Sequence, residues 1–285
     1  MTAPTSTRLA LAALLLLGGC DGTSALDAGL APDAATALDA GTTDASTTDA
    51  GFEDAGVAND AGIDAGPLDA GPPGVDAGPD GPIGILSGAC GEIDDELLSP
   101  MPFVFENHLD FGPTALTMMD LDRLSPGAME ILAEGTIGGS SVYSEAFAYE
   151  VLYRCEGATL LKSESEIVYV DPMGTHTDML VEMAGSRVGV SVTRAVGFPR
   201  DAPYPVADAT TLLMRKLVDV GESTANVAAE DAWVKQILHV VAYSAMHAES
   251  MQMAWSGIDP SVRGDTILVI TVTDGADEFI YTNML

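Results

Sequence analysis

Residues 21–82 restrict what this chain can fold into more than any other part of the sequence. The segment repeats the triplet Asp-Ala-Gly eight times, carries 13 acidic residues and no Lys or Arg, and gathers prolines toward its end. It has too few large apolar side chains to offset the conformational entropy of ordering its backbone, and its like charges repel one another. We therefore predict a disordered tether over residues 21–83 and a globular domain over residues 84–285, with residues 84–139 as a candidate separate lobe.

The globular part is itself strongly acidic. The whole chain has a net charge of −32, and residues 83–285 hold 30 acidic and 10 basic side chains. A surface of this charge repels phosphate backbones, so nucleic acid is not an expected partner. The acidic balance favours cations or a basic protein partner, with an ordinary solvated surface as the alternative interpretation.

The first 20 residues have the features of an export signal. Arg8 supplies a positive start, Leu9–Leu17 is an apolar run too short to span a bilayer, and small residues precede Cys20. The run Leu17-Gly18-Gly19-Cys20 resembles the lipobox of bacterial lipoproteins. The resemblance implies that residues 1–20 are a signal peptide and that Cys20 becomes an acylated N-terminus. The protein would then be anchored to the cell membrane by lipid, palmitate included, and would face the periplasm or the cell exterior.

Two further cysteines remain after Cys20, and they are Cys90 and Cys155. In an exported chain, two leftover cysteines suggest a disulfide, with unrelated buried thiols as the alternative. Closing a loop of this length would stabilise the fold by roughly 4 kcal/mol in the chain-entropy model. The bond would fasten the start of the domain to the end of a helix.

Residues 177–195 alternate apolar and polar side chains as a β-hairpin does. We expect one face to carry Met179, Val181, Met183, Val188, Val190 and Val192. We expect the other face to carry Asp178, Leu180, Glu182, Gly189, Ser191 and Thr193. Glycine suits the first central position of a two-residue turn, which places the turn at Gly185-Ser186. This turn predicts that Leu180 pairs with Ser191 and Asp178 with Thr193.

Capping residues and apolar patterns predict the remaining elements. A helix is expected between Ser125-Pro126 and Gly135, and another between Ser140 or Ser141 and Gly157. Further helices are predicted over residues 206–220 and 229–255, and strands over residues 103–111, 159–161, 166–170, 265–272 and 279–281. The expected fold is α/β, with a mixed central sheet and a hairpin flanked by helices in the order α-β-β-β-α-α-β.

That order, over residues 140–273, resembles the core of the PD-(D/E)xK nuclease superfamily. In this family a helix glutamate, a hairpin aspartate and a Glu-x-Lys on the next strand position Mg²⁺ at a phosphodiester. The resemblance implies that Glu145 and Asp178 are metal ligands and catalytic residues. Ser191 and Thr193 stand where the Glu-x-Lys would be, and Lys216 is expected to replace the missing lysine.

Two functions from different classes follow. Because Ser191 and Thr193 would be weak neutral ligands, we expect a non-catalytic binding or scaffolding module of the cell envelope that needs no cofactor. Its partner is unidentified and is expected to be basic. The alternative is a nuclease or phosphodiesterase that depends on Mg²⁺ or Mn²⁺.

Overall fold

The structure of the protein is a computed structural model, and it describes residues 82–136, 141–200 and 202–285. The predicted signal peptide with Cys20, the tether up to residue 81, and Ser140 lie outside the described residues. Within the described part, no helix combines the length and the apolar character that crossing a bilayer requires.

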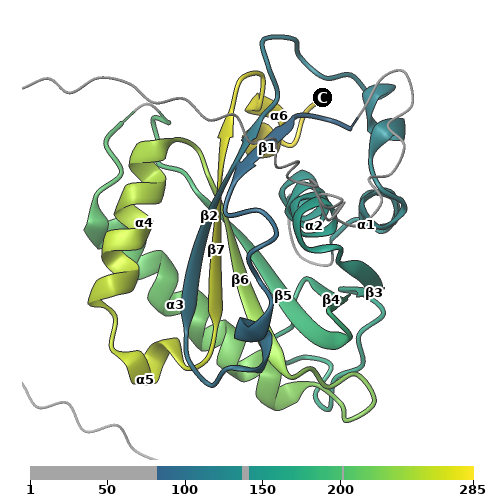
Figure 1. Cartoon of the computed structure of the whole chain (residues 1–285), viewed down its shortest axis with the longest axis vertical. Coiled ribbons are helices and arrows are strands. Elements are labelled where there is room, and N and C mark those ends of the chain that lie inside the picture. Colours follow the sequence, from purple (N-terminus) through teal and green to yellow (C-terminus); the bar gives the residue numbers. More distant parts are fainter. Residues whose placement is uncertain (1–81, 137–140, 201) are drawn as a thin grey trace, which may run out of the picture. The chain divides into compact units, whose positions relative to one another are not determined.

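A seven-stranded mixed sheet forms the centre of the domain and confirms the predicted α/β fold (Figure 1). Its order is β1-β2-β7-β6-β5-β4-β3, in which β2, β7, β6 and β5 run parallel to one another, and the pairs β1–β2, β5–β4 and β4–β3 are antiparallel. The strands are β1 (Ile85–Gly88), β2 (Phe103–Asp110), β3 (Thr159–Ser163), β4 (Met179–Met183), β5 (Ser186–Ala195), β6 (Lys235–Ala242) and β7 (Ile267–Asp274). Parallel strands β6 and β7 are buried almost throughout, as expected where helices cover both faces.

Helices cover both faces of this sheet (Figure 1). α1 (Pro126–Glu134) and α2 (Val142–Glu156) pack on one face, and α3 (Val206–Asn226) and α4 (Ala245–Gly257) pack on the other. The short elements are two 3-10 helices (Asp95–Leu98 and Asp120–Arg123), α5 (Pro260–Arg263) and α6 (Glu278–Thr282).

The predicted caps of α1 and the predicted glycine cap of α2 are confirmed, whereas Ser141 stands at the N-cap of α2 without a capping hydrogen bond from its side chain. The Ser125 side chain accepts a hydrogen bond from the Ala128 amide at the start of α1, and α1 ends at Gly135. Gly157 adopts the left-handed conformation that ends α2.

The predicted long helix over residues 229–255 is wrong. Residues Lys235–Ala242 form the central strand β6, and a helix begins only at Ala245. The apolar residues Ile237, Leu238 and Val241 fit a helical period, but Val240 is also apolar, and Ile237, Val240 and Val241 are β-branched. Such a run fits a fully buried strand equally well, so periodicity alone does not separate the two. The observed order after β5 is therefore α3-β6-α4-β7 rather than α-α-β.

Two smaller predictions are also wrong. Residues 279–281 lie in α6 and not in an edge strand, because Phe279, Ile280 and Tyr281 turn their side chains into the core from one short helix. Residues 166–170 form no strand, and their ladder contact is a single bridge between Tyr169 and Val227. Tyr169 packs there with Ile167, Leu180 and Trp233 in a small separate cluster.

The hairpin is formed, but its turn lies one residue earlier than predicted. Ala184 and Gly185 both have positive φ, and Met183 pairs with Ser186. Leu180 therefore pairs with Gly189 instead of Ser191, and the predicted partner of Asp178, Thr193, is wrong. Moving the turn by one residue moves each partner by two, so every side chain keeps its predicted face. All six residues of the predicted apolar face lie in the large core with α1 and α2.

The predicted disulfide between Cys90 and Cys155 is confirmed. It joins the segment after β1 to the last turn of α2. Next to it, the Arg154 guanidinium donates to the main-chain oxygens of Ile83 and Gly84, at 2.7 and 3.1 Å. The first residues of the domain are thus held against α2 by a covalent bond and by hydrogen bonds.

Candidate functional site

The candidate site lies where strands β4 and β5 part. β4 begins at Met179, but β5 continues beyond its partner to Ala195. Asp178 stands at this point: its amide donates to the Val190 oxygen at 3.0 Å, and its Oδ2 accepts from the Val192 amide at 2.6 Å. The Asp178 carboxylate thus replaces the strand partner that β5 lacks, and its position is fixed by the backbone.

Glu145 reaches this place from the first turn of α2. Glu145 is only 4% exposed, and its Oε1 accepts a hydrogen bond from Ser141 Oγ at 2.6 Å. Burial and, to a smaller extent, the negative charge of Asp178 together raise the pKa of Glu145 to about 8. The side chain therefore holds a proton at neutral pH unless a positive charge enters the site.

The pKa of the Asp178 carboxyl group is also raised. Burial raises the pKa of Asp178 to about 6, although the Val192 amide and the charge of Lys216 both favour its ionised form. Glu145 is buried and Asp178 is half-buried, and two such carboxyl groups that sense each other's charge cannot both ionise without cost. This pair is therefore prepared to share a proton or to receive a cation.

Three more charged side chains act on this pair. Lys216, half-buried on α3, favours the ionised form of both carboxyl groups, and Glu164, just after β3, opposes it. Burial lowers the pKa of Arg194 on β5, and the charges of Tyr281 and Glu145 oppose that change. The site therefore draws on α2, β4, β5 and α3, which are far apart in the sequence.

Among the described residues, no hydrogen bond joins Ser191 or Thr193 to the carboxyl groups of Glu145 and Asp178. Ser191 is buried, and its Oγ lies 2.9 Å from Thr177 Oγ1. The Thr177 amide in turn donates to the Tyr169 hydroxyl at 2.8 Å. Within the described residues, Thr193 makes no hydrogen bond to either carboxylate. Ser191 thus fixes the segment leading into Asp178, and the predicted catalytic role of these two hydroxyls gains no contact that would support it.

The donor chemistry of the pair fits Mg²⁺ or Mn²⁺. Hard divalent cations prefer carboxylate oxygens, and Mg²⁺ is commonly held by one or two carboxylates together with waters and substrate phosphates. Glu145 and Asp178 supply two such groups. In this arrangement the oxygens of Glu145, Asp178 and Glu164 do not all lie within 4.8 Å of one another. We therefore assign Glu164 an electrostatic role and not that of a third direct ligand.

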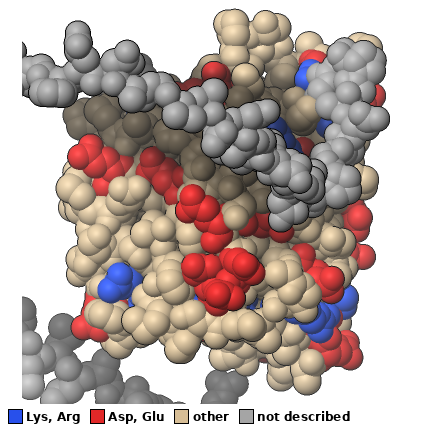
Figure 2. Space-filling model, in the orientation of Figure 1, with Lys and Arg blue, Asp and Glu red and all other residues tan. Residues whose placement is uncertain are grey.

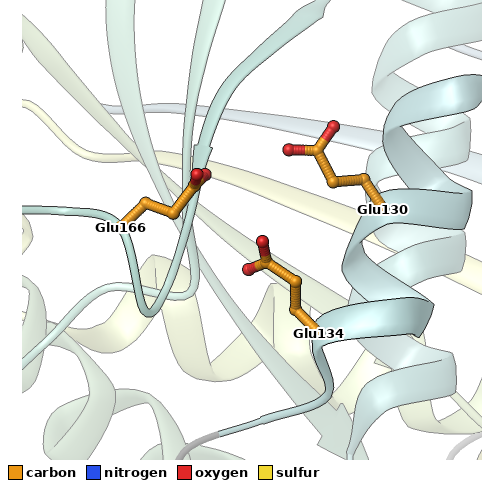
Figure 3. Close-up of side chains that lie close together, drawn as sticks. All are labelled: Glu130, Glu134 and Glu166. Carbon is orange, nitrogen blue, oxygen red and sulfur yellow. The ribbon is translucent and has the colours of Figure 1, made fainter.

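A second acidic group lies outside this site. Glu130 and Glu134 extend from α1 toward Glu166 in the loop after β3 (Figure 3), with ligand atoms within 4.8 Å of one another. All three residues are exposed. Glu134 accepts hydrogen bonds from Ser163 and Ser165, and Glu166 accepts one from the Ser163 amide at 3.1 Å. These bonds hold the end of β3, so we assign the group a structural role.

A cavity of about 280 Å³ opens elsewhere, at the starts of β6 and β7. Its walls include Trp233, Gln236, Arg263 and Asp265, and none of the predicted site residues lines it.

No family model matches the chain. The AAC-rich mRNA clone AAC4 protein of Dictyostelium discoideum is 35% identical over 164 residues, which cover 55% of this chain and 24% of that protein. The chain thus spans about a quarter of the relative's length. A structure of SfsA from Pyrococcus furiosus in complex with Ca²⁺ is 12% identical and covers 52% of this chain and 59% of its own, with a TM-score of 0.22. At that score the likeness supports no argument about this protein.

The sequence analysis named Glu145, Asp178 and Lys216, whose charges influence one another in the structure, but it did not name Glu164 or Arg194. Glu164 directly follows the predicted strand over residues 159–161, next to the hairpin that carries Asp178, and this position was the available signal. Arg194 follows Thr193, one residue beyond the place compared with Glu-x-Lys.

Proposed function

We propose that the domain binds Mg²⁺ or Mn²⁺ between Glu145 and Asp178 and uses it to hydrolyse phosphodiesters. The observation that carries this proposal is a pair of fixed carboxyl groups, Glu145 buried and bonded to Ser141 and Asp178 half-buried and bonded to the Val192 amide, whose pKa values are both raised by burial. Within the described residues, neither carboxyl group forms an ion pair with a cationic side chain, in contrast to Asp231, which binds Lys162 and Arg187. In the same part of the chain, Lys216 makes no ion pair with Glu145 or Asp178, although its charge favours the ionised form of both.

Each side chain has a definite task under this proposal. Ser141 and the Val192 amide orient Glu145 and Asp178, so that one carboxylate oxygen of each stays directed to the site. A bound cation supplies Lewis acidity toward a phosphoryl oxygen and lowers the pKa of water. Lys216 stabilises the negative charge that develops on the phosphoryl group, which is the role of lysine in such sites.

A second candidate function is a non-catalytic binding module of the cell envelope. The observation that favours it is Ser191, which stands at the Glu-x-Lys position and whose hydroxyl is already bonded to Thr177. Such a module would bind the cation or a basic partner without turnover.

The two candidates separate in one experiment. The purified protein is incubated with DNA, RNA and a chromogenic phosphodiester, with and without Mg²⁺ or Mn²⁺, beside Asp178→Asn and Glu166→Gln variants. Cation-dependent cleavage that is lost in Asp178→Asn and kept in Glu166→Gln supports hydrolysis. Cation binding without cleavage supports the binding module, and cleavage that Asp178→Asn leaves intact contradicts a role for this site.

We further propose that Cys20 is acylated and anchors the protein to the cell membrane, with the tether between the anchor and the domain. The support is the lipobox-like run at residues 17–20 and the apolar run before it. Several acyl chains on one residue give stable membrane attachment, which a single chain does not. Cys20→Ser is expected to move the protein from the membrane to the soluble fraction, and unchanged fractionation contradicts the anchor.

A further inference from the structure

We infer that the site at Glu145 and Asp178 takes compact phosphodiesters carrying one or two phosphates, and not DNA or RNA chains. The inference rests on the proposed function and names its substrate class. It is carried by the charge of the domain and by what its few basic side chains do.

Most basic side chains of the domain are already committed to protein groups. Residues 83–285 contain 10 Lys and Arg against 30 Asp and Glu. The committed ones are Arg123 with Asp120, Arg154 with Ile83 and Gly84, Lys162 and Arg187 with Asp231, Arg200 with Glu278, and Lys235 with Ser99 and Met101. A polyanion gains affinity from each phosphate that a free Lys or Arg neutralises. The described domain has few such residues to offer.

The surface around them opposes a long polyanion. On the face shown in Figure 2, Asp and Glu outnumber Lys and Arg and form several red patches. At physiological salt, charges interact over about 8 Å, which is about two phosphates along one nucleic-acid strand. Phosphates flanking the reacting one would therefore meet acidic side chains, whereas a compact ester has no flanking phosphates to repel.

The positive charge available at the site suits one or two phosphates. The charge of Lys216 on α3 acts on both carboxyl groups, and Arg194 on β5 interacts electrostatically with Glu145. Arg194 Nη1 donates to the Ile280 oxygen at 2.9 Å and lies 3.5 Å from Asn283 Oδ1, so α6 fixes the guanidinium in place. Both contacts use one nitrogen, and a guanidinium can bind phosphate oxygens through the others. One ammonium and one guanidinium, with a divalent cation, match the charge of a small ester.

The reaction itself is a simple hydrolysis that needs no co-reactant besides water. The water oxygen bonds to phosphorus, the bond from phosphorus to one ester oxygen breaks, and that oxygen leaves as an alcohol with one proton from water. The products are an alcohol and a phosphomonoester.

The test compares the two substrate classes on the purified protein with Mn²⁺. The compact substrates are bis(p-nitrophenyl) phosphate and thymidine 5′-p-nitrophenyl phosphate, and the polymers are single-stranded DNA, RNA and duplex DNA. We expect kcat/KM for the compact esters to exceed the value per linkage of the polymers by at least tenfold. Raising the salt from low to physiological is expected to increase any polymer cleavage, because it screens repulsion.

Two variants assign the selectivity to the site. Arg194→Gln is expected to raise KM for the compact esters about tenfold with a smaller change in kcat, whereas Arg263→Gln, at the distant cavity, should leave both unchanged. Faster cleavage of polymers per linkage, weakened by salt, overturns the inference and leaves the proposed hydrolysis intact. Cleavage of neither class overturns the proposed hydrolysis and this inference with it.

Discussion

The acidic centre at Asp231 and the one at Glu145 and Asp178 shift the pKa of their carboxyl groups in opposite directions. Asp231 is 2% exposed, and it is held by Lys162 at 2.7 Å, by the Val168 amide at 2.8 Å and by Arg187 at 3.5 Å. Burial alone would raise the pKa of Asp231, but these partners outweigh it, and the pKa lies below its ordinary value. At Glu145 and Asp178 burial prevails instead, and both pKa values rise.

The difference distinguishes Asp231, whose ion pairs stabilise the fold, from Glu145 and Asp178, whose carboxyl groups remain available to bind a ligand. Asp231 joins β3, β5 and the loop after β3, and its charge is matched within the protein. The Glu145 and Asp178 pair is left with hydrogen bonds but without a bonded cation, which lowers stability and leaves capacity for a ligand. Perturbed carboxyl groups of this kind cluster at functional sites.

The largest expected effect comes from removing the matched acid. Asp231→Ala leaves Lys162 and Arg187 without their partner in a half-buried place, so the free energy of unfolding should fall by about 3–5 kcal/mol. Urea unfolding measures this loss. The matched variant Asp178→Ala should cost less, about 1–3 kcal/mol, since it leaves only the Val192 amide without its acceptor and removes an acid whose charge is already unfavourable. Equal losses in both variants would erase the contrast between the two centres.

The next effect is on the pH dependence of stability. Glu145 has a folded pKa of about 8 against an ordinary 4.5, so the folded state binds more protons between these values. Stability therefore falls as pH rises through this window, by about 2–4 kcal/mol between pH 5 and 8.5, since one pKa unit corresponds to about 1.4 kcal/mol. Glu145→Gln should remove this slope and be the more stable protein at pH 8.5. A wild-type slope of opposite sign over this range would contradict the assignment.

Addition of a divalent cation should stabilise the protein through the Glu145 and Asp178 pair and not through Asp231. At about 100 times its dissociation constant, Mn²⁺ should raise the free energy of unfolding by about 2.7 kcal/mol at pH 7.5. The gain should vanish in Asp178→Asn and persist in Glu166→Gln. Loss of the gain in Glu166→Gln instead would place the cation at the exposed group of Figure 3.

The smallest effect is expected from Lys216→Met. Because Lys216 favours the ionised carboxyl groups, its removal should move the pH window of Glu145 and Asp178 upward. The change in stability should stay below about 1 kcal/mol, since the side chain is partly solvated, and it should shrink at high salt. Arg215→Met, its exposed neighbour, is the control. A larger effect in Arg215→Met than in Lys216→Met would show that Arg215, and not Lys216, supplies the positive charge that acts on the two carboxyl groups.

Local signals in the sequence predicted the elements around the site well. Ser125, Gly135 and Gly157 correctly marked ends of α1 and α2, because a helix cap depends on neighbouring residues alone. The alternation of apolar and polar residues correctly assigned the two faces of the hairpin. The register was missed because Ala184, a residue that seldom adopts positive φ, takes the first turn position. β6 was missed because a fully buried strand leaves no polar alternation to read.

The site itself was predictable only in part. Glu145, Asp178 and Lys216 were found through the resemblance of their element order to a known core. Glu164 and Arg194 depend on how the loop after β3 and the end of β5 fold back toward α2, and no local pattern reports that. The matched state of Asp231 depends on partners 63 and 69 residues away in the sequence.

The most direct test of the contrast is a carboxyl-carbon NMR titration of the labelled protein, with and without Mg²⁺. Without the cation, Glu145 and Asp178 should titrate above their ordinary values, and Asp231 below its own. Saturating Mg²⁺ should move the titrations of Glu145 and Asp178 to lower pH and leave Asp231 unchanged. Ordinary titration of Glu145 and Asp178, or titrations that Mg²⁺ does not move, would contradict a cation site at this pair.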